Sequence, residues 1–258
     1  MARPVPSPTE TSEQSGGIVV FARSPERGRV KTRLARTLGD DAALALHRAF
    51  LADTLEACRR SGARVLLAHT PGPAPAEVAQ ADVAFEQRGE SFGERVDAAL
   101  REARERLGAG PLLVVAMDTP HVGPERLRAA LERLAAAPAL LGPSPGGGFW
   151  LLGFAGAQVP LAPAFAADNE CAAVARLLAR AGCAPALFDF TFDVDVERDL
   201  VELLCLLETR ASAGTGWLPA HTLRAIASLA LRVVPSPDGA AGAGSRALEL
   251  AIGDGRAR

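Results

Sequence analysis

The feature that most constrains the fold is an alternation along the chain. Short apolar runs, each ended by Gly, Pro or Asp, are separated by longer stretches in which apolar residues recur with helical spacing. The clearest run, residues 111–117, reads PLLVVAM and is ended by Asp118. Such runs are typical of strands that are buried on both faces of a parallel sheet. The alternation therefore predicts an α/β fold, a three-layer α/β/α sandwich with a mostly parallel central sheet.

The same patterns give the expected elements. We expect strands over residues 17–22, 63–68, 83–85, 111–117, 139–142, 148–154 and 187–192. We expect helices over residues 39–60, 91–107, 124–134, 168–181, 197–207 and 223–233. The helix from Ser91 opens with a pattern that resembles a capping box, because Glu94 follows Ser91 by three positions.

Composition divides the chain into three parts. Residues 1–16 are rich in Pro, Ser, Thr and Glu and contain no apolar core of a signal peptide, so we expect a disordered leader. Residues 17–207 carry the strand and helix patterns of one α/β domain. The pattern weakens over residues 208–258, a C-terminal extension of unassigned role that includes a Pro/Gly/Ala-rich linker at 236–245.

Charge and cysteine content exclude several classes of function. The net charge of −2 argues against a broad nucleic-acid-binding surface, and no apolar run has the length of a membrane span. The four cysteines form no C-x-x-C pair and no zinc pattern. We expect buried free thiols at Cys58, Cys171 and Cys205. The sequence thus predicts a cytoplasmic protein that binds neither nucleic acid nor membrane, with a homodimer left open.

The chain contains one lysine, Lys31, beside 27 arginines. A lysine kept against that bias indicates a site that needs a compact ammonium group. Lys31 lies just after the first predicted strand, where α/β proteins bind phosphates, and Gly28 allows a tight turn there. Its segment also contains Arg23, Arg27, Arg29 and Arg33, a charge that suits a di- or triphosphate. The segment lacks the G-K-[ST] ending of a Walker A phosphate loop and the G-x-G-x-x-G motif of dinucleotide-binding proteins. A solvated basic turn is the alternative.

Carboxylates follow two of the predicted strands. Asp118 comes directly after the buried run at 111–117, where a carboxylate is costly to desolvate unless it meets a cation. Mg²⁺ bridging phosphate oxygens is a natural partner, and a helix cap near Pro120 is the alternative. Asp193 and Asp195 point the same way along an extended segment and form a candidate second metal contact. Asp195 equally suits a cap of the following helix.

Three consecutive glycines, Gly146 to Gly148, lie between two predicted strands. They permit the backbone to approach a ligand closely, and a flexible hairpin is the alternative. None of the four histidines has a partner in the sequence, and only His121 is near a candidate site. No Ser-His-Asp or Cys-His catalytic arrangement can be assigned.

Five segments in order resemble the motifs of the selenodomain-associated glycosyltransferase-like proteins. This family belongs to the nucleotide-diphospho-sugar transferase (GT-A) superfamily, with relatives such as 2-phospho-lactate guanylyltransferase and the molybdenum-cofactor guanylyltransferase. The segments are residues 21–34 (FARSPERGRVKTRL), 87–95 (QRGESFGER), 117–120 (MDTP), 142–153 (GPSPGGGFWLLG) and 192–200 (FDVDVERDL).

The resemblance implies a Mg²⁺- or Mn²⁺-dependent transferase with a GT-A fold. Its substrates would be a nucleotide sugar or a nucleoside triphosphate and a small-molecule acceptor. Lys31 and Asp118 would be catalytic, with Asp193 and Asp195 beside Asp118 at the metal. The nucleotide would be bound by Arg23, Gly28, Lys31, Arg33, Gly89 and Arg95, and the acceptor or sugar would lie over Gly147 and Gly148.

Two positions depart from the family pattern. Gly146 stands where the family usually has Asp, and Phe149 stands where it has Tyr. Three functions are therefore kept. The first is a glycosyltransferase acting on a small molecule. The second is a guanylyltransferase-like nucleotidyltransferase that joins a nucleoside triphosphate to a phosphorylated small molecule. The third is a catalytically weakened nucleotide-binding protein.

Overall fold

A seven-stranded sheet forms the centre of the protein. The computed structural model describes residues 16–235, 248–253 and 256–257. The strand order is β3-β2-β1-β4-β6-β5-β7. Strand β6 is antiparallel to both neighbours, and the other neighbouring pairs are parallel, as predicted. The strands are β1 (Gly17–Ala22), β2 (Arg64–His69), β3 (Val83–Glu86), β4 (Leu112–Ala116), β5 (Ala139–Pro143), β6 (Phe149–Phe154) and β7 (Pro185–Leu187).

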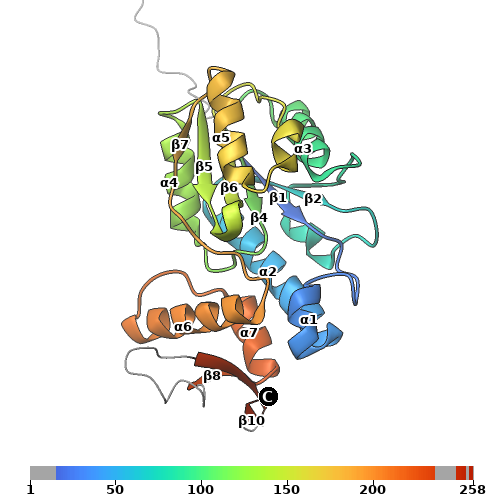
Figure 1. Cartoon of the computed structure of the whole chain (residues 1–258), viewed down its shortest axis with the longest axis vertical. Coiled ribbons are helices and arrows are strands. Elements are labelled where there is room, and N and C mark those ends of the chain that lie inside the picture. The colour runs from blue at the N-terminus through green and yellow to red at the C-terminus, as the bar shows by residue number, and fades with distance from the viewer. Residues whose placement is uncertain (1–15, 236–247, 254–255, 258) are drawn as a thin grey trace, which may run out of the picture.

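Helices cover both faces of this sheet and complete the predicted three layers (Figure 1). The helices are α1 (Thr32–Leu38), α2 (Asp40–Arg60), α3 (Phe92–Leu107), α4 (Pro124–Leu134), α5 (Glu170–Arg180), α6 (Glu197–Ala213) and α7 (Ala220–Ser228). Ile18 and Val20 of β1 share a core with α2 and α4, while Val19 and Phe21 share the other core with α3 and α5. Alternate residues of a strand point to opposite faces, so both faces of β1 are buried.

Helix α3 begins at the predicted capping box. The hydroxyl of Ser91 accepts a hydrogen bond from the Glu94 N–H at 3.2 Å. The Glu94 carboxylate accepts one from the Ser91 N–H at 3.1 Å. The two bonds satisfy backbone donors that would otherwise be free at the start of the helix.

The predicted strand over residues 187–192 is wrong in most of its length. Strand β7 pairs with β5 only over Pro185–Leu187. The chain then leaves the sheet: Phe190 is 64% exposed, and the Phe192 ring stacks on His121 at 4.3 Å. The apolar residues after Leu187 pack locally outside the sheet. A pattern of apolar residues does not distinguish such packing from a strand.

The predicted helix over residues 223–233 is also corrected. Helix α7 ends at Ser228, Ala230 takes a positive φ of 48°, and the chain turns into strand β8 (Leu231–Pro235). Strands β9 (Leu248–Ile252) and β10 (Arg256–Ala257) complete a small antiparallel sheet with β8. A second unpredicted element is α1, which begins inside the basic segment. Residues 1–15 of the expected leader and the linker at 236–245 lie outside the described residues.

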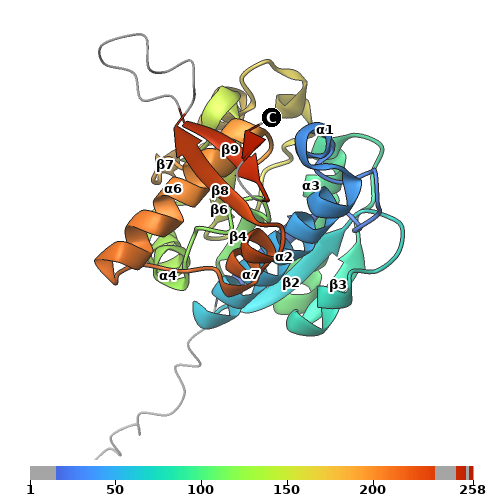
Figure 2. The same cartoon turned by 90° about the horizontal axis from the view of Figure 1, so that it is seen from below.

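The C-terminal elements are helices α6 and α7 and strands β8, β9 and β10. They lie together at one end of the α/β body (Figures 1 and 2). Helix α6 continues without a break past residue 207, where the sequence suggested a boundary. The buried carboxylate of Asp53, on α2, accepts backbone hydrogen bonds from His221 at 3.0 Å and Thr222 at 2.6 Å. These bonds fix the start of α7 to the α/β body.

All four cysteines are free thiols, including the three for which this was predicted. Burial was predicted for three of them and is found for Cys58, whereas Cys171 and Cys205 are partly exposed. Within the described part of the chain, no helix combines the length and apolar character needed to cross a membrane.

Candidate functional site

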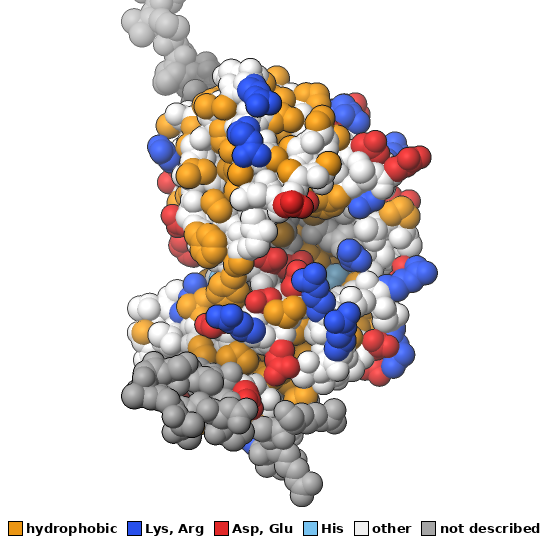
Figure 3. Space-filling view, viewed as in Figure 1, with side chains coloured by type: hydrophobic (Ala, Val, Ile, Leu, Met, Phe, Trp, Pro, Cys, Tyr) orange, Lys and Arg blue, Asp and Glu red, His pale blue; other side chains and the backbone are white. Residues whose placement is uncertain are grey.

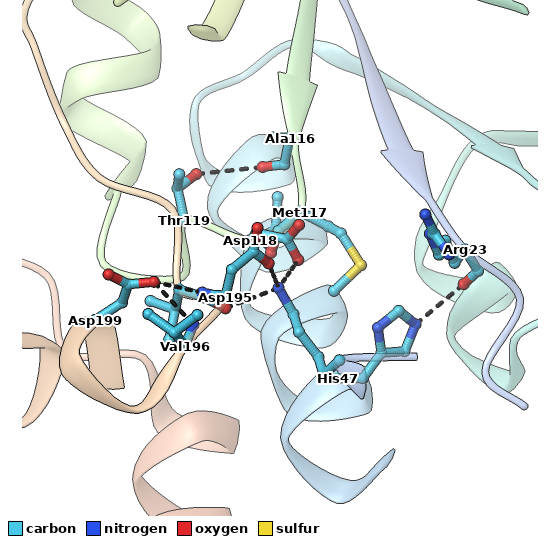
Figure 4. A network of polar contacts seen from close by, with 12 residues as sticks. Arg23, His47, Ala116, Met117, Asp118, Thr119, Asp195, Val196 and Asp199 are labelled. Atoms are coloured by element: carbon cyan, nitrogen blue, oxygen red, sulfur yellow. Dashed lines mark hydrogen bonds and ion pairs between the residues drawn. The ribbon is translucent and has the colours of Figure 1, made fainter. Parts of the chain in front are cut away.

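The candidate site lies at the carboxyl end of β4. Asp118 follows this strand, and its carbonyl accepts a hydrogen bond from the Val194 N–H at 2.9 Å. That bond places Asp195, just before α6, beside Asp118 although the two are far apart in the sequence. Figure 4 shows both carboxylates directed at one ammonium group, that of Lys31. The sequence thus singled out three residues that the structure brings together.

Lys31 is fully engaged by this arrangement. Its Nζ lies 2.5 Å from Asp118 Oδ1, 2.9 Å from Asp195 Oδ1 and 2.8 Å from the Val194 carbonyl oxygen. Its side chain is only 4% exposed. Because an ammonium group has three N–H donors, none remains for a phosphate in this arrangement. The structure therefore gives Lys31 a different contact from the expected phosphate: it holds two carboxylates together.

The backbone and the charge of Lys31 both follow from this position. Its φ of 46° lies in the left-handed region, which costs a residue with a side chain about 1–2 kcal/mol. Burial lowers the pKa of the Lys31 ammonium, but attraction to Asp118 and Asp195 outweighs burial and raises the pKa above its ordinary value. Lys31 is therefore a permanent cation at this site.

The basic segment does not form one continuous phosphate cradle. Arg27 Nε lies 2.7 Å from Asp41 Oδ1, and Arg29 pairs with Glu26 at 3.1 Å. Both pairs are largely exposed. These two arginines are thus held by local acids. Arg33 forms no ion pair with an acidic residue among those described, and it lines a cavity beside this edge of the sheet. Arg33 is the cation of the segment that a ligand in this cavity would meet.

His47 fixes the start of the basic segment and was not expected from the sequence. Its Nε2 donates a hydrogen bond to the Arg23 carbonyl oxygen at 3.0 Å (Figure 4). Burial lowers the pKa of His47 to about 4, so the ring is neutral at pH 7. The Arg23 side chain itself is exposed. No sequence motif points to His47, because its partner is a backbone atom.

A cavity of about 470 Å³ opens beside this edge of the sheet. Its charged lining residues are Arg33, Asp168, Glu170 and Asp193. The glycine turn at 146–148 lines it too, as the sequence predicts for Gly147 and Gly148. A Cβ at Gly147 would lie 3.1 Å from Asn169, and this glycine has a φ of 81°. Only glycine fits there without a shift, and the turn packs closely on the start of α5.

Gly146 differs from its neighbour in the turn. It has a φ of 73°, yet no atom lies within 4 Å of a Cβ built there. A side chain at this position would meet open space, and Asp and Asn enter the left-handed region more readily than most residues. The surrounding atoms therefore leave space for an Asp side chain at position 146, where the resembled family usually has Asp.

Two further predicted nucleotide-binding residues shape the turn before α3. Gly89 has a φ of 130°, and a Cβ there would come 2.7 Å from the Cβ of Glu94. Arg95 donates a hydrogen bond to the Glu90 carbonyl oxygen at 3.1 Å. Neither residue lines the cavity, nor does Gly28, which allows a turn with its φ of 75°. Their observed contacts are local ones.

His121 has a packing role, although the sequence places it near a candidate site. Its ring is buried and shares a hydrogen bond of 2.8 Å with the Thr191 hydroxyl. Burial lowers its pKa to about 3. His121 is not among the residues that line the cavity described above.

The acidic residues at the edge of the sheet suit a divalent cation. Asp193 is half-buried, and burial together with the nearby Asp195 and Asp118 raises its pKa. Three carboxylates against one ammonium leave a net charge of about −2. Lys31 uses one oxygen of Asp118 and one of Asp195, which leaves the second oxygen of each available.

These donors do not make a complete metal site alone. Among the described residues, no group of three or more His, Cys, Asp or Glu side chains converges to hold a metal ion. Mg²⁺ is commonly held by one or two carboxylates together with substrate phosphates. The donor chemistry and charge at Asp118 and Asp195 fit an ion that a phosphate completes.

The surface around this site is charged. Figure 3 shows acidic and basic side chains gathered on one face, between the α/β body and the C-terminal elements. A charged, hollowed face over the carboxyl ends of the strands is where α/β proteins bind ligands.

Comparisons with known proteins agree with the fold. Residues 51–167 match the family model "Uncharacterized protein conserved in bacteria (DUF2064)". No curated protein is similar enough to the chain to match it. The chain resembles a solved structure from Desulfovibrio desulfuricans G20, provisionally described as a nucleotide-diphospho-sugar transferase, with 27% identity and a TM-score of 0.71. That match covers 83% of this chain and 95% of the other.

Two more distant structures share the fold. A nucleotidyl transferase from Methanothermobacter thermautotrophicus has 16% identity and a TM-score of 0.53, with 73% of this chain and 95% of the other covered. A cytidylyltransferase from Leptospira borgpetersenii serovar Hardjo-bovis has 13% identity and a TM-score of 0.50, covering 83% and 94%. The chain has the fold of the nucleotide-diphospho-sugar transferases.

Proposed function

We propose that this protein is a glycosyltransferase that takes a sugar from a nucleotide-activated donor and transfers it to a small-molecule acceptor. Membership of the selenodomain-associated glycosyltransferase-like family is part of this proposal. The observation that carries it is the joint position of Asp118, Asp195 and Lys31 at the carboxyl edge of the sheet, beside a cavity lined by a glycine turn. In this fold, that edge is the place for a phosphorylated ligand.

Each residue at the edge would have a distinct task. Asp118 and Asp195 would hold Mg²⁺ or Mn²⁺, which supplies neutralising charge to a departing diphosphate. Lys31 fixes the separation of the two carboxylates, so it acts as a positioning residue. Arg33 offers the cavity a guanidinium group for phosphate oxygens.

The transfer itself needs a base near the acceptor. The acceptor oxygen or nitrogen forms a bond to the anomeric carbon of the sugar, and the bond from that carbon to the diphosphate oxygen breaks. The diphosphate leaves with the electron pair, and the acceptor proton passes to a carboxylate of the cavity. Asp193 and Glu170 suit this step, because burial raises the pKa of each and makes it a better proton acceptor.

The charge of the cavity favours glycosyl transfer over nucleotidyl transfer to a phosphorylated acceptor. Three of its four charged lining residues are carboxylates: Asp168, Glu170 and Asp193. A phosphorylated acceptor would need to enter beside these carboxylates with Arg33 as the one cation of the lining. Like charges in a partly enclosed site repel strongly, so a neutral or cationic acceptor fits better.

Calorimetry and thermal unfolding with nucleotide sugars and nucleoside triphosphates test this function. We expect a nucleotide sugar to bind and stabilise the protein only when Mg²⁺ is present. Asp118→Asn and Arg33→Ala should each weaken that binding at least about tenfold, since each removes a charged contact. Arg29→Ala, which removes an exposed pair with Glu26, is the matched control and should leave affinity unchanged.

Product analysis separates the rival functions. Release of pyrophosphate from a triphosphate in the presence of a phosphorylated acceptor would establish nucleotidyl transfer instead. If a nucleotide sugar binds but no nucleotide is released with any of the acceptors tried, the protein is a nucleotide-binding protein without transferase activity. Unchanged affinity in both Asp118→Asn and Arg33→Ala would contradict the assigned site.

A further inference from the structure

One wall of the cavity is formed by phenylalanine rings. Four phenylalanine rings meet edge to face in series: Phe21 and Phe92 at 6.2 Å, Phe92 and Phe165 at 5.1 Å, and Phe165 and Phe149 at 5.8 Å. Phe21, Phe92 and Phe149 line the cavity. Phe92 is 45% exposed, an unusual state for a ring held among other rings. A ligand with an apolar surface would cover it.

Another part of the lining is acidic. Asp168 and Glu170 lie at the start of α5, and neither has a cationic partner within the described ranges. Burial raises the pKa of the Glu170 carboxyl group. Because Gly147 packs on Asn169, the glycine turn lies directly beside this acidic end. The cavity therefore has an apolar wall and an end that accepts hydrogen bonds.

We propose that the acceptor is a molecule with an apolar ring or short hydrocarbon body and a hydrogen-bond-donating head, a hydroxyl or an amine. The body would cover Phe92 and Phe149, and the head would donate to Glu170. The proposal rests on the proposed function and names its acceptor class. A volume of about 470 Å³ suits a small molecule of this kind. Repulsion from Glu170 and Asp168 disfavours a carboxylate or phosphate head.

Three probes with one ring and different heads test the acceptor class. We would titrate the full chain with 2-phenylethanol, 2-phenylethylamine and 3-phenylpropionate and measure binding by ligand-observed NMR. We expect the alcohol and the amine to bind and the carboxylate to bind at least about tenfold more weakly. The alcohol and amine arms show which donor the site prefers.

Variants assign the binding to the two ends of the cavity. Phe92→Ala should weaken the alcohol and the amine alike, by about tenfold, because the ring loses its apolar contact. Glu170→Gln should weaken the amine about tenfold and the alcohol less, because only the amine loses a charged partner. Phe190→Ala and Glu125→Gln remove an exposed ring and a carboxylate outside the cavity and serve as matched controls.

Three results would overturn the inference: carboxylate binding as strong as that of the alcohol, probe binding unaffected by Phe92→Ala, or no binding of any probe. Phe92→Leu provides a second variant should Phe92→Ala lower stability. Nucleotide-sugar binding is measured on the same samples. Failure of the probes with intact nucleotide binding rejects only the acceptor class, whereas absence of nucleotide binding by the unaltered protein rejects the proposed function.

Discussion

Lys31 holds two carboxylates of the candidate site together, and its ammonium group has no N–H donor left for a ligand. In Lys31→Met, Asp118 and Asp195 would face each other without a cation. We expect the free energy of unfolding to fall by about 2 kcal/mol, less than for a fully buried pair. The carboxylates are 30% and 42% exposed, so water compensates part of the loss. Mg²⁺ should raise the Tm of Lys31→Met more than that of the unaltered protein, because it replaces the missing charge.

Arg29→Met is the control for this prediction. Arg29 is 74% exposed where it pairs with Glu26, and surface pairs of this kind contribute under about 1 kcal/mol. Thermal unfolding of both variants with and without Mg²⁺ makes the comparison. Equal stability of Lys31→Met and Arg29→Met would contradict the positioning role.

The sequence identified residues of the candidate site, but it did not identify the contacts that these residues make. Lys31 stands out by composition, and Asp118 by its place after a buried strand. The pairing of Lys31 with Asp195 joins residues 164 positions apart, and no local pattern encodes that distance. His47 was missed for a different reason, since a hydrogen bond to a carbonyl depends on backbone geometry and not on the type of residue that supplies it.

Two buried carboxylates offer a matched test at the level of single elements. Asp53 binds the backbone N–H groups of His221 and Thr222, and Asp97 binds those of Leu161 and Ala162 at 2.8 and 3.0 Å. Each substitution to Asn should cost about 1–3 kcal/mol, because the amide keeps one accepting oxygen and leaves the second backbone N–H facing an NH2 group. Hydrogen exchange should rise in α7 for Asp53→Asn and around residues 161–166 for Asp97→Asn.

Each variant is the control of the other in this experiment. A rise in exchange over both regions in either variant would show that the two carboxylates act on overall stability and not on their own elements. No rise in either region would contradict the anchoring role of both.

Elements with a clear period were predicted well, and mixed apolar stretches were not. The capping box at Ser91 and the central strands were confirmed because residue type and spacing both specify them. The segment after Leu187 misled the prediction because its apolar residues are divided between exposed positions and a stack on His121. Helix α1 was hidden in a segment whose charges drew attention to phosphate binding.

For the whole molecule, buried neutral histidines predict sensitivity to acid. The pKa of His47 is lowered to about 4 and that of His121 to about 3, against about 6.5 in an unfolded chain. The unfolded chain therefore binds more protons below pH 6.5, and the stability from these residues is fully present above that pH. It is lost as the pH falls from 6.5 toward 4 and 3. At pH 5 each histidine should lower the free energy of unfolding by about 2 kcal/mol relative to its value above pH 6.5.

Urea unfolding at pH 7, 6 and 5 measures this dependence. His47→Gln should show about half the fall in the free energy of unfolding between pH 6.5 and 5, because one of the two titrating rings is gone. An unchanged fall in the variant would contradict the contribution of His47.

Helix α2 contacts both the strand end at the candidate site and the start of α7 through adjacent residues. The Thr54 hydroxyl donates to the Met117 carbonyl at 3.2 Å, one residue before Asp118, while Asp53 holds the start of α7. This arrangement has a consequence for evolution. A descendant protein without the C-terminal elements would keep the carboxylate of Asp53 on α2. That carboxylate would have lost its hydrogen-bond donors, on the same helix that holds the end of β4. We therefore expect selection to oppose shortening of the gene from its 3′ end until a compensating change appears at position 53.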